Sequence, residues 1–434
     1  MKTLFTNAFI LTADDKNKWI KDGFMLVDGK TIAALGDGDE LSSIQGQADQ
    51  IVDLKGKWVM PGWINTHGHA AMSILRGFAD DYPLQIWLED KMWPMEAQFT
   101  AETVRWGTAL AIVEMLKSGT TCFVDMYDHM DVVAEVVEES GIRGVLTRGI
   151  IGLCSEAEQK AKLKEATSFA ERWHTQAGGR ITTMMAPHSA YTCPPEYIRR
   201  IVEEAVRLSL PIHIHLSETK AEVEQNVTDY GERPVKHLEK IGLFHCPTLV
   251  AHAVHLTEEE MEILKAYDVK ISHNPSSNLK LGSGIAPVPQ LIDKGFHVSI
   301  GTDSAASNNN LDMFEEVRFA ALIHKGVHQD PTLIPAETAF KMGTRWGAEA
   351  VFLSTVGSLE VGKEADFIVL DPRQAHLQPE QDPLSHIIYS AKGADVTDVY
   401  VQGRHVVKNR ECIYLDEEKV VYEANKALSR LKAV

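Results

Sequence analysis

The stretch GWINTHGHAAM, residues 62–72, places two imidazoles two residues apart directly after an apolar run. Side chains at positions i and i+2 of a strand point to the same face of a sheet. If residues 63–66 form a strand, His67 and His69 therefore converge just past its end. An H-x-H pair alone is equally compatible with a metal site and with an ordinary polar loop, so the surrounding sequence has to decide.

Helical and apolar segments alternate through the middle of the chain. The segment AETVRWGTALAIVEMLKSG (101–119) predicts a helix and is followed by the apolar TTCFVDM (120–126). The same plan recurs in EYIRRIVEEAVRLSL (196–210) and PIHIHLSE (211–218). Such alternation predicts a parallel sheet with crossover helices. About eight strands are expected, which favours a closed (β/α)8 barrel of the TIM type. The strands should begin near Trp63, Thr121, Arg143, Ile181, Ile212, Thr248, Val269 and Val298.

Both ends of the chain have a different sequence pattern, in which short apolar stretches are interrupted by Asp-Gly and Lys-Gly. Examples are GFMLVDGKTIAALG (23–36) and GSLEVGKEADFIVLD (357–371). Such stretches predict β-hairpins. Since chain termini often lie close together, the two ends are expected to form one small β-sandwich domain. The predicted α/β architecture is therefore a β domain of residues 1–60 and 360–434 beside a catalytic barrel of residues 61–359.

The net charge of the chain excludes some classes of binding partner. The 434 residues carry a formal charge of −18, and no lysine or arginine cluster stands out. Such a chain repels nucleic acid and anionic membrane surfaces, so neither is expected as a partner. The start of the sequence lacks the features of a signal peptide, and the five cysteines are scattered. We expect a reduced, cytoplasmic protein that acts on small molecules and self-associates as a homo-oligomer.

A titratable group follows almost every predicted strand. In barrels of this kind, chemistry collects at the C-terminal ends of the strands. A purely structural barrel has no reason to place such groups there, so the pattern favours a metal site. The groups, in chain order, are His67, His69, Asp125, Arg148, His188, His213, His215, Glu218, His252, His273 and Asp303.

Zinc suits a site of imidazole nitrogens and a carboxylate oxygen with one position open for water. The best ligand set is His67, His69, His215 and Asp303. One divalent metal per chain is expected, because His188 stands where a dinuclear site would need a carboxylated lysine. The ligands would also accept ferrous iron, Fe2+.

Other groups near the predicted ligands have distinct expected roles. Glu218, three residues past His215, is placed to shuttle protons, and His252 to orient the attacking water by hydrogen bonding. His213 is expected to be a packed barrel histidine, whereas His273 is compatible with either a backbone contact or a pocket role. Asp125 could either cap the helix that follows it or take part in the site, and the sequence leaves both roles open.

Several ordered motifs resemble the amidohydrolase superfamily, in its purine and S-triazine deaminase and chlorohydrolase branch. They are PGWINTHGH (61–69), HIHLSE (213–218), SHNPSSNLKLGSG (272–284), GTDSAASNNNLDMFEE (301–316) and GSLEVGKEADFIVLD (357–371). The similarity covers nearly the whole chain and implies the same metal ligands, with Glu218 as proton shuttle and His252 beside the water. Many relatives have T-H-T-H where this chain has T-H-G-H, and we expect no change in ligation from Gly68.

The resemblance also implies a substrate pocket. Glu96 in MWPMEAQFT (92–100) resembles a glutamate that holds ribose hydroxyls, and Trp87 would line the same pocket. His188 would contact the purine, and Arg148 resembles an arginine that meets the carboxylate of a homocysteine tail. Glu218 would protonate purine N1.

The expected reaction is hydrolytic deamination of 5'-methylthioadenosine and/or S-adenosylhomocysteine, with adenosine a further candidate, to the inosine analogue and ammonia. A metal-activated water would attack purine C6. The alternatives are a related deaminase or chlorohydrolase acting on guanine, a pterin, a pyrimidine or an S-triazine, and a catalytically silent barrel used as a scaffold. Retention of Glu218 favours loss of an amine over loss of chloride.

Overall fold

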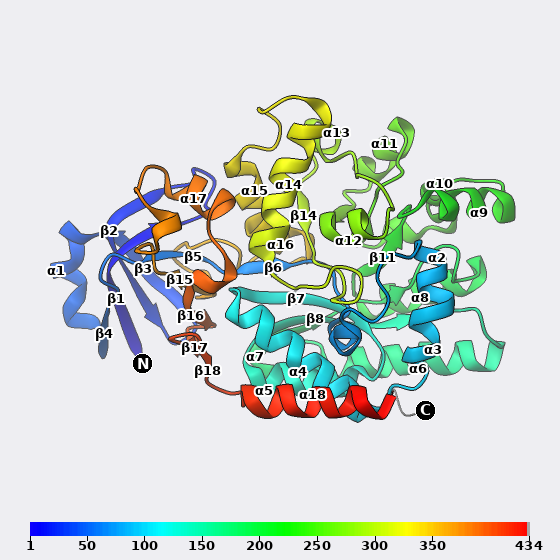
Figure 1. Cartoon of the computed structure of the whole chain (residues 1–434), viewed down its shortest axis with the longest axis horizontal. Coiled ribbons are helices and arrows are strands. Elements are labelled where there is room, and N and C mark those ends of the chain that lie inside the picture. Colours follow the sequence, from blue (N-terminus) through cyan, green and yellow to red (C-terminus); the bar gives the residue numbers. More distant parts are fainter. Residues whose placement is uncertain (432–434) are drawn as a thin grey trace.

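The chain folds into one mixed sheet, two parallel sheets and the helices that cover them (Figure 1). The computed structural model describes residues 1–431. Within this range, strands from both ends of the chain share the mixed sheet, and the middle of the chain supplies the parallel sheets.

The mixed sheet has nine strands in the order β18-β17-β16-β15-β5-β1-β2-β3, with β4 paired to β1. The two chain ends meet where β15 runs antiparallel to β5, with Phe367 opposite Pro61. The strands are β1 (Lys2–Leu11), β2 (Trp19–Asp28), β3 (Thr31–Asp37), β4 (Gln50–Asp53), β5 (Trp58–Pro61), β15 (Phe367–Leu370), β16 (Val396–Val401), β17 (Arg404–Lys408) and β18 (Glu411–Cys412).

These strands form one continuous hydrogen-bonded sheet, which differs from the two separate sheets of a simple sandwich. The physical reason lies in β1, whose pairing with β2 shifts register between Phe5 and Ala8 and again between Ala8 and Ile10. Such irregularities bend a strand and increase its twist. The first half of β1 consequently pairs with β4 and the second half with β5. A single bent strand therefore connects the two parts of the sheet through hydrogen bonds.

The two parallel sheets hold strands at all the predicted places, each beginning at or next to the predicted residue. One sheet has the order β10-β8-β7-β6, with β9 paired to β8, and the other has the order β11-β12-β13-β14. The strands are β6 (Trp63–Asn65), β7 (Thr120–Tyr127), β8 (Arg143–Ile150), β9 (Ile181–Thr183), β10 (Ala186–Pro187), β11 (Ile212–Leu216), β12 (Thr248–His252), β13 (Lys270–His273) and β14 (Val298–Ile300).

Backbone contacts link the two parallel sheets on both sides. Isolated parallel bridges join Met185 to Ile212 and Ser189 to His215. On the other side, the Thr66 N–H donates to the carbonyl of Ile300 over 3.0 Å. The carboxyl ends of β6, β11, β12 and β14 are thereby held near one another.

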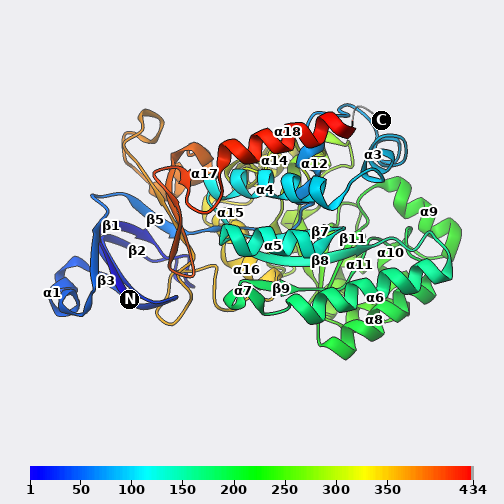
Figure 2. The same ribbon diagram turned by 90° about the horizontal axis from the view of Figure 1, so that it is seen from below.

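Helices follow most of these strands and pack outside them, and the C-terminal α18 lies along α4 (Figure 2). The predicted capping box of Thr257 and Glu260 is confirmed at the start of α11. The helices are α1 (Leu41–Ile44), α2 (Leu84–Ile86), α3 (Trp93–Glu96), α4 (Ala101–Lys117), α5 (Met130–Ser140), α6 (Glu156–Trp173), α7 (Gln176–Gly179), α8 (Pro195–Leu208), α9 (Lys220–Tyr230), α10 (Pro234–Ile241), α11 (Glu258–Ala266), α12 (Pro275–Lys280), α13 (Val288–Asp293), α14 (Met313–His328), α15 (Ala336–Gly343), α16 (Arg345–Ala350), α17 (Pro383–Tyr389) and α18 (Glu417–Leu431).

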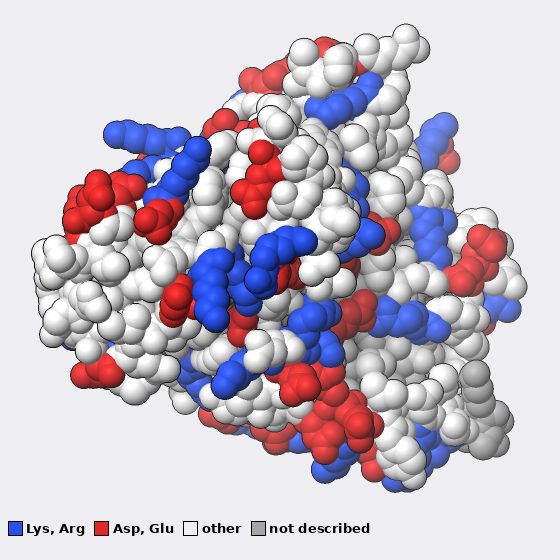
Figure 3. Space-filling model, turned by 60° about the vertical axis from the view of Figure 1, so that its left-hand side comes forward, with Lys and Arg blue, Asp and Glu red and all other residues white. Residues whose placement is uncertain are grey.

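One face of the molecule is mixed in charge. On the face shown in Figure 3, acidic and basic side chains are interspersed, so this face offers no uniform basic surface of the kind that binds a phosphate backbone. Among residues 1–431, no helix combines the length and the apolar character needed to cross a membrane.

A buried ion-pair cluster joins the parallel strands to the mixed sheet. Arg143, at the start of β8, donates from Nε to Asp366 over 2.9 Å and from Nη2 to Glu364 over 2.6 Å. Its side chain is only 2% exposed. Since both carboxylates directly precede β15, this arginine ties the two parts of the molecule together.

Replacing Arg143 with methionine should lower the free energy of unfolding by about 3–5 kcal/mol, because the buried Asp366 loses its cation. Glu364 would keep only its pair with Lys30. Thermal unfolding followed by circular dichroism would measure the loss. The matched control is Arg207→Met, which breaks exposed pairs with Glu171 and Glu204 and should cost less than about 1 kcal/mol. Equal losses for both variants would contradict this account of the junction.

Candidate active site

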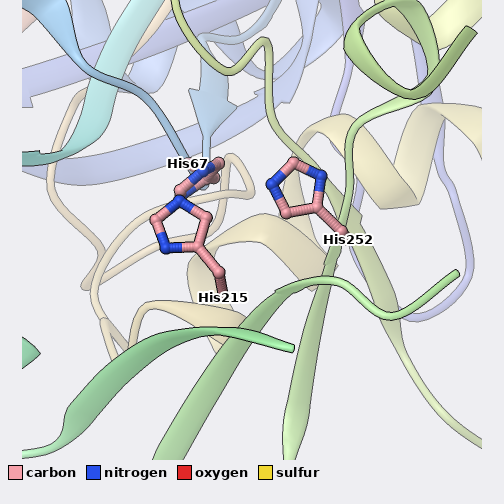
Figure 4. A group of neighbouring side chains, drawn as sticks. All are labelled: His67, His215 and His252. Atoms are coloured by element: carbon pink, nitrogen blue, oxygen red, sulfur yellow. The ribbon is translucent and has the colours of Figure 1, made fainter. Parts of the chain in front are cut away.

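The predicted metal ligands lie together at the carboxyl ends of the parallel strands. His67 and His69 follow β6, His215 belongs to β11, and Asp303 follows β14. His252, the last residue of β12, completes the group. Figure 4 shows the rings of His67, His215 and His252 gathered around one point, and one nitrogen from each lies within 4.8 Å of the others.

Donor atoms of all four predicted ligands face one another. Oδ1 of Asp303 lies 3.6 Å from Nε2 of His67 and 3.3 Å from Nε2 of His69. Nε2 of His69 is 3.4 Å from Nε2 of His215. The second oxygen of Asp303 accepts a hydrogen bond from Ser277 Oγ over 2.6 Å, which fixes the direction of the carboxylate.

Backbone carbonyls set the tautomers of two of these histidines. Nδ1 of His69 is 2.6 Å from the carbonyl oxygen of Met126, and Nδ1 of His215 is 2.8 Å from that of His188. A carbonyl oxygen only accepts, so each Nδ1 carries the proton of a neutral ring. Each Nε2 therefore presents a lone pair to the centre of the site.

His67 reaches the same state through a second imidazole. Nδ1 of His213 lies 3.0 Å from the carbonyl oxygen of Leu249 and so carries the proton. Nε2 of His213 must then accept, and it is 2.8 Å from Nδ1 of His67. His67 consequently keeps its own Nε2 unprotonated. The prediction that His213 is a packed barrel histidine omits this role, which depends on Leu249 in the neighbouring strand.

The donor set fits a metal cation. Nε2 of His67 and Nε2 of His252 are buried and have no hydrogen-bond partner among the described residues. Burial and the neighbouring imidazoles hold the pKa of His67 and of His215 well below the ordinary value. These rings are therefore neutral at physiological pH, which is the form that ligates a metal.

Glu218 and His252 form a pair beside these donors. Burial raises the pKa of Glu218, and its Oε2 lies 3.8 Å from Nε2 of His252. Burial alone would lower the pKa of His252, but the carboxylates of Glu218 and Asp303 raise it above the ordinary value. Nδ1 of His252 is held by Oδ1 of Asn278 at 2.8 Å. The pair can exchange a proton without large movement.

Glu222 anchors the turn that carries Glu218. Its two oxygens accept the backbone N–H of Ser217 over 3.0 Å and that of Glu218 over 2.7 Å. Burial, together with the nearby Glu218, raises the pKa of Glu222 to about 7. The prediction overlooked this residue, although Thr219 and Glu222 match the T-x-x-E pattern that starts a helix.

Asp125 supports the H-x-H segment from the neighbouring strand. Its Oδ1 accepts the backbone N–H of Ala70 over 2.7 Å, immediately after His69. Burial raises the pKa of Asp125 to about 6. Of the two roles left open for this residue, the structure shows the backbone contact, with the turn after β6 rather than with the helix that follows β7.

Two site residues have left-handed backbone conformations. The φ angle is 72° at His252 and 60° at Asp303. Such conformations cost free energy in residues other than glycine and are frequent at functional sites. Close packing also constrains the site, since a Cβ at Gly301 would lie 2.6 Å from the backbone nitrogen of His67.

A cavity of about 550 Å³ opens from this cluster. The four residues expected to bind substrate besides Glu218, namely Trp87, Glu96, Arg148 and His188, all line it. So do several residues that the prediction omitted: Met72, Leu88, Trp93, Phe99, Tyr127, Asp128, Lys162, Tyr191 and Leu281. Tyr127 ends β7, and the others lie on the loops and helices that connect the strands, so sequence spacing does not reveal that they converge.

The residues expected to contact substrate are held by neighbouring side chains or have shifted pKa values. Tyr127 donates its hydroxyl proton to Glu96 Oε1 over 2.6 Å, and burial raises the pKa of Glu96. Burial and nearby histidines lower the pKa of His188 to about 3, so its ring is neutral. Arg148 already pairs with Asp128 and Glu165. His273 does not line this cavity but lies beside His324, with ring centroids 5.8 Å apart.

The amidohydrolase family model matches residues 58–406, which include every residue of this cluster. The chain belongs to the amidohydrolase family. The resemblance inferred from the motifs is thereby confirmed. The match spans the parallel sheets, the cavity and part of the mixed sheet.

Full-length relatives make the similarity more specific. The chain is 50% identical to a 5-methylthioadenosine/S-adenosylhomocysteine deaminase of Halalkalibacterium halodurans, over 99% of each chain. It is 45% identical to a protein of the same name from Shouchella clausii, over 100% of each chain. A crystal structure of an adenosine deaminase from Xanthomonas campestris with bound zinc is 34% identical, with a TM-score of 0.93 over 100% of this chain and 99% of that chain.

Replacing His213 with leucine should weaken zinc binding about 10- to 100-fold, because His67 loses the acceptor that orients its ring. Competition with a chromogenic chelator would measure the affinity without reference to activity. His213→Gln should restore part of the affinity, since its amide oxygen can accept from Nδ1 of His67.

The control for this prediction is His174→Leu. The ring of His174 bonds Thr183 and does not line the cavity, so zinc affinity should not change. If His213→Leu binds zinc as tightly as the unaltered protein, the proposed relay of hydrogen bonds does not set the geometry of His67.

Proposed function

We propose that this protein hydrolytically deaminates 5'-methylthioadenosine and/or S-adenosylhomocysteine to the inosine analogue and ammonia. The observation that carries the proposal is the convergence of the histidine and aspartate donors with the Glu218–His252 pair at the wall of one cavity. The names of the relatives that are 45–50% identical over their full length support the choice of substrate. Adenosine is a further candidate, in line with the Xanthomonas structure.

We assign one divalent metal per chain to His67, His69, His215 and Asp303. Their buried, neutral imidazoles and single carboxylate suit zinc, and the related Xanthomonas structure contains zinc. Fe2+ would accept the same ligands. When bound, the metal supplies Lewis-acid activation of water.

The protein's own groups move the protons. The reaction forms a bond from C6 to a water oxygen, breaks the C6–N bond and consumes one water, with no change of oxidation state. Glu218, whose pKa is raised by burial, holds a proton that it can give to purine N1. His252 and Asp303 take the first proton from the attacking water, and Asp303 hands it to the departing amine, which leaves as ammonia. The second proton, lost from the C6 hydroxyl as the carbonyl forms, restores the proton of Glu218.

Other residues orient the nucleoside. The neutral ring of His188 faces the purine, Trp87 contributes an apolar wall, and Glu96 accepts hydrogen bonds from the ribose hydroxyls. Tyr127 holds Glu96 in place through its 2.6 Å hydrogen bond. Arg148 meets the carboxylate of a homocysteine tail.

We also propose that the two parallel sheets form one closed (β/α)8 barrel of residues 61–359. The backbone contacts on both sides of the sheets support closure. The small β domain then comprises residues 1–60 and 360–434, of which 432–434 lie outside the described residues, and the pairing of β5 and β15 supports the union of the two chain ends. Within this range α18 packs against α4 of the barrel rather than against the mixed sheet. Cytoplasmic location and self-association stay predictions from the sequence.

Zinc-loaded protein should shift the adenine absorption band of both thioether nucleosides to shorter wavelength and release one ammonia per nucleoside. Glu218→Gln should lower kcat by about 10²- to 10⁴-fold, because a positioned proton donor and acceptor is lost. Its zinc content should remain that of the unaltered protein. Full activity of this variant would exclude Glu218 as the proton shuttle, and failure of the unaltered protein on every adenine nucleoside would refute the proposal.

Glu96→Gln should lower kcat/KM for the nucleosides about 10- to 100-fold, through loss of charged hydrogen bonds to the ribose. Activity on guanine, a free base, tests the alternative hypothesis that the protein is a guanine deaminase. If guanine is the true substrate, the unaltered protein deaminates it, and Glu96→Gln loses little of this activity because guanine has no ribose. Steady-state assays of both compounds with both proteins make the comparison.

A further inference from the structure

A buried glutamate lies between two segments that carry residues of the candidate active site. Glu316, in the first turn of α14, is fully buried. Its Oε2 accepts the backbone N–H of Ser276 over 3.3 Å, and its Oε1 accepts from Nδ2 of Asn308 over 2.7 Å. Ser276 belongs to α12, which follows β13, and Asn308 belongs to the loop after β14. Glu316 therefore joins two segments that follow neighbouring strands.

The first segment, α12, orients two groups of the site. Ser277 Oγ donates to Oδ2 of Asp303 over 2.6 Å. Oδ1 of Asn278 accepts from Nδ1 of His252 over 2.8 Å. Both residues directly follow Ser276 in the same short helix. Any movement at the start of α12 is therefore passed to a predicted metal ligand and to the histidine beside it.

Glu316 stands in for the N-cap of this helix. Asn274, at the N-cap position, makes no capping hydrogen bond with its side chain. The first N–H groups of a helix have no partner within the helix and need an acceptor from elsewhere. The N–H of Ser276 finds this acceptor in Glu316, and a carboxylate is favourable beside the N-terminus of a helix. The position of α12 thus depends on a side chain 40 residues away in the sequence.

The second segment carries Asp303 itself. Nδ2 of Asn308 donates to the carbonyl oxygen of Thr302 over 2.8 Å, in addition to its bond to Glu316. The φ angle of 60° at Asp303 is left-handed, which costs free energy in a residue other than glycine. Surrounding contacts have to hold this conformation. Asn308 supplies one of them at the residue directly before Asp303, and Glu316 in turn orients Asn308.

Burial of the Glu316 carboxyl group costs free energy. Within residues 1–431 this group accepts from two amide donors and forms no ion pair. Burial raises the pKa of Glu316 to about 8, although hydrogen bonds from Ser276 and Asn308 oppose the rise. An apolar side chain would fill the same space without this desolvation cost. A buried acid with a shifted pKa that contacts segments of an active site points to a functional role rather than to stability.

We propose that Glu316 is a positioning residue, which fixes the Asp303 carboxylate as a metal ligand and the His252 ring beside it. It acts through α12 and through the loop after β14. The inference rests on the proposed metal assignment and does not depend on which nucleoside is the substrate. It also explains why residues 272–284 and 301–316 carry polar side chains that contact neither the substrate cavity nor the solvent, since these side chains connect the two segments.

The first test is Glu316→Gln, which keeps the shape of the side chain but leaves one acceptor oxygen for two N–H donors. Zinc affinity, measured by competition with a chromogenic chelator, should fall about 10- to 100-fold. The visible absorption bands of the cobalt-loaded protein should change as well, because these bands depend on the arrangement of the ligands. The matched control is Glu315→Gln on the same helix. The carboxylate of Glu315 accepts from Asn310, so zinc affinity should change less than about threefold.

A double-mutant cycle separates positioning from general destabilisation. Ser277→Ala removes the donor to Asp303 directly. If Glu316 acts through this contact, the double variant should lose less zinc affinity than the product of the two single losses. Losses that simply multiply would overturn the inference. Unchanged zinc affinity and unchanged cobalt bands in folded Glu316→Gln would overturn it too.

Circular dichroism shows whether each variant is folded. If Glu316→Gln does not fold, Asn308→Leu takes its place, because it removes the link to Thr302 and leaves Glu316 intact. Zinc affinity should then fall in Asn308→Leu, and an unchanged affinity would overturn the inference. If the unaltered protein binds no zinc, the metal assignment fails and the inference fails with it. If it binds zinc but deaminates no adenine nucleoside, only the proposed reaction fails, and the zinc affinities still decide the role of Glu316.

Discussion

The site depends on one constraint, that each imidazole must present an unprotonated Nε2 to a common centre. Hydrogen bonds at Nδ1 impose this state, directly from the carbonyls of Met126 and His188 and through His213 from that of Leu249. These acceptors belong to or follow neighbouring strands, so the sheet itself selects the tautomers. A change in strand register would move the acceptors as well as the ligands, and the fold and the metal chemistry are therefore inseparable.

Much of the architecture was predictable because it depends on local sequence patterns, namely the alternation of helical and apolar segments. Alternating helical and apolar segments located the parallel strands, and the i, i+2 spacing brought His67 and His69 together. The candidate ligands could be singled out because they lie at or just after the ends of strands whose carboxyl ends meet. Glu218 was a candidate proton shuttle for the same reason, since it lies just past β11.

What the sequence did not reveal depends on contacts between distant segments. The role of His213 needs the carbonyl of Leu249, and the anchoring of Glu218 needs a helix start that turns back on the strand end. The engagement of Arg148 by Asp128 and Glu165 likewise involves three separate elements. The bends in β1 that make one sheet from the two chain ends depend on partner strands, so composition could indicate strands but not their pairing.

The most direct test of the account is an anomalous difference map from a zinc-loaded crystal at the zinc absorption edge. The account predicts a single strong peak about 2.0–2.3 Å from Nε2 of His67, His69 and His215 and from a carboxylate oxygen of Asp303. It also predicts that the Nδ1 atoms keep their present acceptors. A peak elsewhere, a second metal in the cavity, or ligation through an Nδ1 atom would contradict it.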